Sequence, residues 1–168
     1  MSNQGWSASV AEKLARSGAD DLLYGAIVTA AVLVAAGGHD SSSERVLVAW
    51  GFVIVTYFLT HVYVHAAHSQ LSGDTRNLFQ RSGAAARSEL GILEGGIPAM
   101  VVFLAASLIE PSAFSAAQVA LWFTVVLLAV VGYLGSRRAG RTRRASLGEA
   151  AGAAMLGVLM VAAKTLLH

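Results

Sequence analysis

The run VLVAWGFVIVTYFLTHVYVHAA, residues 46–67, decides the fold of this chain because it is strongly apolar and holds no Asp, Glu, Lys or Arg. A helix rises about 1.5 Å per residue, so a run of about 20 apolar residues crosses the roughly 30 Å hydrocarbon core of a bilayer. His61 and His65 lie in this run, and with His68 they are spaced i, i+4 and i+7, on one helix face. The run therefore predicts a transmembrane helix that carries a stripe of histidines.

Four further segments are apolar and long enough to span a bilayer. They are residues 22–38, 92–109, 116–134 and 147–167. Only 13% of the 168 residues are charged, whereas soluble domains carry about 25%, and the mean hydropathy is +0.61. Because the connections are short, neighbouring spans are expected to be antiparallel. We therefore expect an all-α polytopic membrane protein in which residues 19–168 form one bundle of five transmembrane helices.

The basic residues predict the orientation of these spans, because cytoplasmic loops of membrane proteins are enriched in Lys and Arg. With five spans and a cytoplasmic N-terminus, Arg45 is the only basic residue in an outer loop. The inner segments then hold Lys13, Arg16, Arg76, Arg81, Arg87, Arg137, Arg138, Arg141, Arg143 and Arg144. The C-terminus is expected to be external, with Lys164 reaching outward to headgroups or to Glu110.

Residues 1–18 are expected to lie outside the bundle, on the cytoplasmic side. Trp6, Val10 and Leu14 are spaced four apart, which predicts a short amphipathic helix at the membrane interface. A frayed polar tail is the alternative. The segment lacks the basic start, apolar core and cleavage site of a signal peptide, so we expect it to be retained.

The amino-acid composition indicates the source of the protein and the class of partner that it binds. Ten of the 12 basic residues are arginines, and alanine and glycine are abundant, which favours a GC-rich bacterial genome and hence a bacterial cytoplasmic (inner) membrane. The basic residues lie in short loops, which argues against a nucleic-acid partner. We expect the lipid bilayer as partner, together with further copies of the chain or a larger membrane complex. The chain has no cysteine, which excludes thiolate chemistry and Cys-ligated metal clusters.

Small residues predict where helix backbones approach closely. Two small-xxx-small pairs are present, Gly91 with Gly95 and Gly148 with Gly152. Pro98 lacks the N–H that would bond the carbonyl of Glu94. Either the helix is kinked or partly unwound at that point, or the proline lies in the first turns, where it is tolerated.

Ionisable groups from four spans converge at the predicted cytoplasmic end. They are the three histidines, Asp20, Asp21, Glu89, Glu94 and Glu149. A carboxylate in a first turn often only caps its helix, and a neutral histidine often only bonds a carbonyl or hydroxyl of a neighbouring helix. Ionisable residues within a membrane also mark ion and proton pathways. The candidate pathway residues are His61, His65, Glu94, Asp21 and Tyr24.

A metal site is the alternative use of the stripe. Histidines at i and i+4 chelate Zn²⁺ or a similar metal from one helix, so His61, His65 and His68 are candidate ligands, with Glu94 as a further one. Haem would require axial histidines on two helices. We expect no cofactor, with a bound metal ion as the alternative. No G-x-S-x-G or H-E-x-x-H motif occurs, so we assign no catalytic residue.

Two motifs, Asp21-Leu-Leu-Tyr24-Gly25 and Leu59-Thr-His61-Val-Tyr63, carry a first resemblance. The chain resembles small integral membrane proteins of actinobacteria that begin their first span with D-x-x-Y-G and carry L-x-H-V-Y on the second. The resemblance implies the same fold and source, and it carries no established activity.

A second resemblance rests on the spacing of Asp21 and Thr29 and on Phe58-x-x-His61. The chain is similar in these positions to the bacterial and endolysosomal potassium-channel family, whose first helix begins F-S-D and whose second carries W-x-x-H. Ala19 and Asp20 replace the family's Phe and Ser, and five spans are expected where six are usual, so the pore residues are not transferred. The resemblance implies ion or proton permeation.

These observations lead to three hypotheses about function. In the first, the protein moves a cation or a proton: His61 and His65 relay protons or respond to pH, while Glu94 and Asp21 hold the charge of the cation. In the second, it is a non-catalytic accessory or assembly subunit of a larger membrane complex. In the third, it is a membrane protein that binds a metal.

Overall fold

The computed structural model describes residues 19–109 and 112–167, and its regular structure there is entirely helical. The helices are α2 (Ala19–Ala36), α3 (Ser43–Leu71), α4 (Leu78–Ser88), α5 (Leu90–Ile109), α6 (Ala113–Arg138) and α7 (Arg143–Leu167). The predicted all-α class is confirmed for this part of the chain. The amphipathic helix expected within residues 1–18 lies outside the described residues.

Four helical stretches within the described residues are long and apolar enough to cross a membrane. They are Ser43–Leu71, Leu78–Ile109, Ala113–Arg138 and Arg143–Leu166. A shorter apolar helix covers Asp21–Ala36. These lengths and compositions are compatible with a membrane protein.

The helices extend beyond the predicted apolar runs because polar residues cap them. Ser42 accepts a hydrogen bond from the backbone N–H of Arg45, so α3 begins before the apolar run. The stretch from His68 to Gly91, expected to be a polar connection, contains α4, which Asn77 caps through the N–H of Gln80. α4 was missed because it is short and its apolar residues do not form a membrane-length run.

Backbone contact between α2 and α5 organises the bundle. A Cβ atom added at Gly25 would lie 2.0 Å from the carbonyl oxygen of Ile92, and one added at Gly95 would lie 2.1 Å from that of Leu22. Real Cβ atoms do not approach backbone oxygens so closely. Only glycine at positions 25 and 95 therefore permits this spacing of the two helices.

A polar link attaches α3 to this pair. Thr29 of α2 is fully buried, and its hydroxyl donates to the carbonyl oxygen of Gly96 at 3.4 Å. The same hydroxyl accepts a hydrogen bond from Nε1 of Trp50 on α3 at 2.9 Å. The hydroxyl thus both donates and accepts, and it joins α2, α3 and α5.

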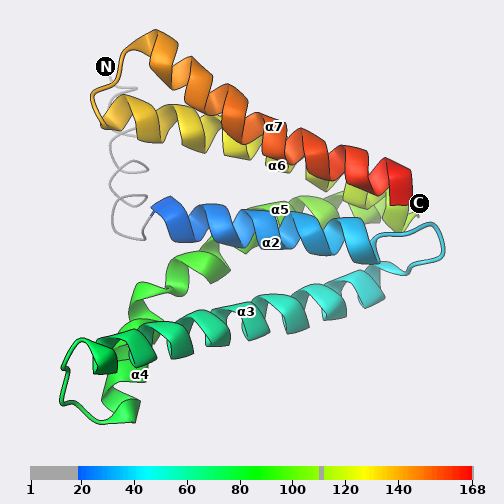
Figure 1. Ribbon diagram of the computed structural model, residues 1–168. Helices are drawn as coiled ribbons and strands as arrows, with labels where there is room; N and C mark the ends of the chain where they lie inside the picture. The colour runs from blue at the N-terminus through cyan, green and yellow to red at the C-terminus, as the bar shows by residue number, and fades with distance from the viewer. Residues whose placement is uncertain (1–18, 110–111, 168) are drawn as a thin grey trace, which may run out of the picture.

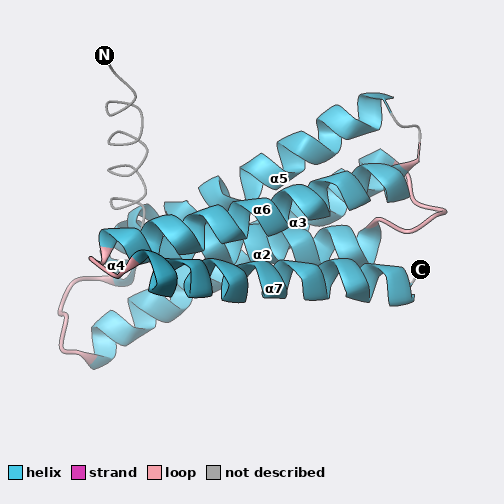
Figure 2. Cartoon of the chain, turned by 90° about the horizontal axis from the view of Figure 1, so that it is seen from above, coloured by secondary structure: helices cyan, strands magenta, loops and turns pink. Residues whose placement is uncertain are grey.

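The remaining helices complete a bundle around α2. Figure 1 shows α6 and α7 side by side along one side of α2, and α3 diverging from α2 toward α4. The start of α2, the α3–α4 connection and the α6–α7 turn lie at one end of the molecule (Figures 1 and 2). The α2–α3 connection, the end of α5, the start of α6 and the end of α7 lie at the other. The core includes Leu33, Phe103 and Leu121 from three helices.

The glycines predicted at helix contacts divide into two groups. Gly95 meets α2 as expected, whereas Gly148 and Gly152 have no atom of another element within 4 Å of an added Cβ, so they do not mediate a helix contact within the described chain. The contact of α7 with α6 instead uses Gly157, which lies against Val125. Pro98 lies inside α5, which remains helical on both sides of it.

We predict that Gly25→Ala destabilises the folded protein by about 1–3 kcal/mol, because the methyl group would push α2 away from α5. Thermal unfolding of the purified protein in detergent measures the effect. Gly152→Ala is the matched control, since its methyl group meets open space, and it is expected to leave stability unchanged or slightly raised. Equal melting temperatures for the two variants would contradict this account of the contact.

Candidate functional site

His61 lies in a group of aromatic rings between α2 and α3. Its ring centroid is 4.4 Å from that of Tyr57, one turn earlier on α3, and 5.9 Å from that of Tyr24 on α2. Its Nδ1 lies 3.3 Å from the carbonyl oxygen of Tyr57. The structure thus brings two of the predicted site residues, His61 and Tyr24, together across a helix interface.

The side chain of His65 on α3 contacts a carboxylate that lies between α4 and α5. Its Nδ1 lies 3.0 Å from Oε1 of Glu89, which follows the last residue of α4. The His65 side chain is 52% exposed and that of Glu89 only 10%. With Glu89 ionised, Nδ1–H donates to the carboxylate, and Nε2 is the nitrogen left to exchange a proton.

Tyr57 lies on α3 together with His61 and with His65 of the His65–Glu89 pair. It lies one turn before His61 and two turns before His65 on the same face of α3. The residues therefore form one continuous set, which we call the histidine cluster. Its members are Tyr24, Tyr57, His61, His65 and Glu89.

The other predicted site residues lie on α2, α3 and α5. Glu94 is exposed and lines a pocket of about 140 Å³ between α2, α5 and α6, together with Leu22, Pro98 and Leu128. Asp21 is partly buried in the first turn of α2, three residues before Tyr24. His68 is exposed in the last turn of α3.

Glu89 is the cluster member that sequence reasoning did not select, although it belongs to the predicted acidic layer. Glu94 was preferred because it lies deeper in an apolar run. The feature that distinguishes Glu89 is local. Glu89 interrupts the helix between α4 and α5, and its backbone N–H donates a hydrogen bond to the carbonyl oxygen of Ala85. The break turns its carboxylate back toward α3.

The predicted metal ligands do not converge. Nδ1 of His61 is directed at its own helix, and Nδ1 of His65 is directed at Glu89. Within residues 19–109 and 112–167, no group of three or more His, Cys, Asp or Glu side chains is placed to hold a metal ion.

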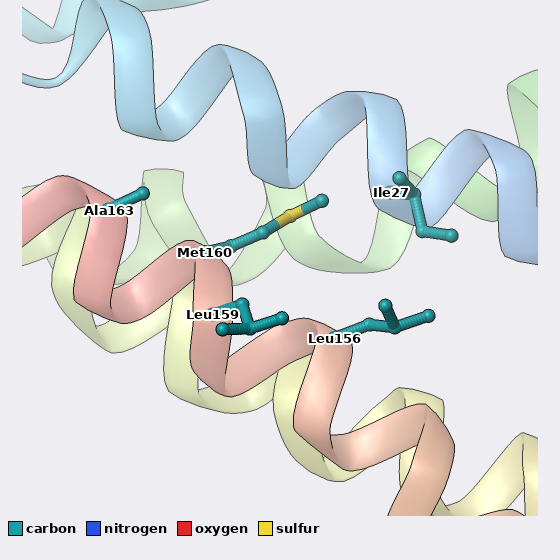
Figure 3. Close-up of a pocket in the computed structure, with 5 residues that line it drawn as sticks. All are labelled: Ile27, Leu156, Leu159, Met160 and Ala163. Carbon is teal, nitrogen blue, oxygen red and sulfur yellow. The ribbon is translucent and has the colours of Figure 1, made fainter.

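A larger cavity of about 350 Å³ lies between α2 and α7 (Figure 3). Its lining residues are all apolar: Ile27, Leu156, Leu159, Met160 and Ala163. Among the residues that the structure describes, no titratable side chain lines this cavity, so its surface offers contact for hydrocarbon rather than for an ion.

Lys164 does not reach outward as expected, because it is fully buried at the far end of α2. Its Nζ donates to the carbonyl oxygens of Leu33 at 3.1 Å and Gly37 at 2.5 Å. It also lies 4.8 Å from the ring centroid of Phe114, on which His39 stacks. The ammonium group donates hydrogen bonds to the last carbonyl groups of α2, and its positive charge lies at the negative end of the helix dipole. The alternative partner, Glu110, lies outside the described residues.

Comparisons with protein-family models, with curated proteins and with solved structures give no match for this chain. The chemistry of the site therefore rests on its own geometry.

We predict that Lys164→Met lowers the free energy of unfolding by about 1–3 kcal/mol, because the carbonyl oxygen of Gly37 loses its buried donor. Methionine keeps most of the aliphatic stem, so the loss reports the ammonium group. Thermal unfolding in detergent is the measurement, with Thr165→Ala, an exposed neighbour on α7, as the control. A melting temperature equal to that of the control would contradict the capping role.

Proposed function

We propose that the chain is an integral protein of a bacterial cytoplasmic membrane, with α2, α3, α5, α6 and α7 crossing the bilayer and the N-terminus in the cytoplasm. Two observations support this topology. α2 has 18 residues, which is just within the range that spans a bilayer. The basic connections, α3–α4 and α6–α7, share one end of the molecule (Figure 1).

We infer that the protein moves a proton or another cation through the cytoplasmic half of the bilayer. The observation that carries this inference is the contact of 3.0 Å between His65 and Glu89, beside the rings of Tyr57 and His61. The exposed His65 gives the cluster access to the cytoplasm, and the shielded Glu89 holds the proton on Nδ1. Tyr24 and Tyr57 extend the set toward the middle of α2 and α3.

A non-catalytic accessory or assembly subunit is the second candidate. The observation in its favour is the unpartnered apolar face of α3, of which a large part is exposed. The exposed residues include Val48, Phe52, Val55, Leu59, Tyr63 and Val64. Such a face packs against lipid or against helices of a further copy or a larger complex. The two candidates differ in whether the purified chain alone moves ions.

We predict that single-cysteine labelling will give the pattern of this topology. The method needs no background substitution, because the chain has no cysteine. In intact cells, a membrane-impermeant maleimide should label Asp40→Cys and Ser112→Cys, in the predicted outer connections. Ser2→Cys and Ala139→Cys should be labelled only after permeabilisation. Equal labelling of positions 2 and 40 in intact cells would show that α2 does not cross.

We predict that the purified protein in liposomes conducts protons or potassium ions, and that His65→Ala and Glu89→Gln each reduce this flux to the level of protein-free vesicles. The pair acts as a unit, so each change removes the proton-holding contact. A pH-sensitive dye inside the vesicles and a potassium electrode outside measure the two fluxes.

His68→Ala is the matched control for these variants, because His68 is an exposed histidine one turn from His65 and outside the cluster. It is expected to keep full flux. Wild-type flux no greater than that of empty vesicles, with recovery in fixed ratio with other membrane proteins, would refute permeation and favour the accessory role.

A further inference from the structure

We propose that α4 is an interfacial helix whose apolar edge inserts into the membrane surface and whose exposed Arg87 binds anionic lipid headgroups. The proposal rests on the membrane location and not on ion movement. At 11 residues, α4 is too short to span a bilayer, and a short amphipathic helix between two spans fits the plane of the interface.

The inward face of α4 fixes its rotation. Arg81, Ala85 and Glu89 recur at intervals of four and are buried against α3 and α5. Nη2 of Arg81 donates to Oε1 of Gln70 on α3 at 3.0 Å, and Glu89 holds His65. With this face turned inward, Phe79, about 200° round the helix from Arg81, points outward.

Exposed apolar side chains at the end of α3 and the start of α4 form an apolar edge. Phe79 is 87% exposed and Leu78 is 52% exposed at the start of α4, and Leu71 is 88% exposed at the end of α3. All three flank the α3–α4 connection. Large apolar side chains that are exposed together beside basic residues are typical of helices that insert shallowly into a bilayer.

The α3–α4 connection is held in a defined shape outside the spans. Arg76 binds the Asp74 carboxylate through Nε and Nη2, at distances of 2.6–3.1 Å. These hydrogen bonds lower the pKa of Asp74 to about 2 and raise that of Arg76. The pair stays ionised at physiological pH and neutralises itself, so the exposed positive charge of α4 is that of Arg87.

The charge of this end of the molecule favours an anionic surface as the occupant. Residues 72–89 and 137–149 together hold eight arginines against Asp74, Glu89 and Glu149. Arg87 is exposed in the last turn of α4. Each basic residue near an anionic membrane contributes about 1 kcal/mol of attraction.

Site-directed spin labelling of the full chain tests the proposal. A nitroxide is attached at Phe79→Cys, and at Gln80→Cys as the matched control, about 100° round the same helix toward Arg87. The protein is reconstituted in vesicles of equal parts phosphatidylglycerol and phosphatidylcholine. The label at 79 should collide more with oxygen than with a water-soluble nickel complex, and the label at 80 should show the reverse.

Two further measurements test whether anionic headgroups contribute to the insertion of position 79. In vesicles of phosphatidylcholine alone, the label at 79 should move toward water, and Arg87→Gln in the Phe79→Cys chain should reproduce that shift in the mixed vesicles. A label at 79 as accessible to nickel as the label at 80 would overturn the proposal. Protection of position 79 in native membranes but not in mixed vesicles would also overturn it, in favour of a protein partner.

The outcome is separable from the proposed function. Flux measured on the same vesicles reports the histidine cluster, whereas labelling of positions 40 and 139 reports topology. Loss of insertion at position 79 with correct topology and normal flux would refute this inference alone.

Discussion

The backbone contact between α2 and α5 is the constraint on which the rest of the structure depends. Gly25 and Gly95 bring the two helices so close that no side chain fits between them. At this spacing the hydroxyl of Thr29 reaches the carbonyl of Gly96 and remains open to the indole of Trp50. The rotation of α3 follows from that link, and with it the side on which the histidine stripe meets α2.

The two ends of α2 have opposite character. At its far end, Lys164 is fully buried and caps the helix from α7. At its start, Tyr24 is 46% exposed and faces His61, while His65 beside them is half-exposed. A buried polar group in a low-dielectric interior must be fully hydrogen-bonded. One end of α2 thus holds a buried, hydrogen-bonded ammonium group, and the other holds a partly exposed cluster of rings.

Sequence periodicity placed His61 and His65 on one face correctly, because the spacing of residues on a single helix depends only on helix geometry. It could not identify Glu89 as the partner of His65. That contact needs α4 to fold back along α3 and the helix to break at Glu89, in a segment too short and too polar to be predicted as a helix. The burial of Lys164 also depended on another element, since it requires α2 to end at the depth of position 164.

The sequence by itself determined the helical class, the apolar segments and the histidine stripe, because these follow from local composition and the period of one helix. The tertiary structure alone decided which glycines are contacts and which carboxylate meets a histidine. Gly95 packs against α2 while Gly152 meets open space, although both belong to similar sequence pairs. The difference arises from the rotation and depth of each helix against its neighbours. Those are set by packing between distant segments, which no local pattern records.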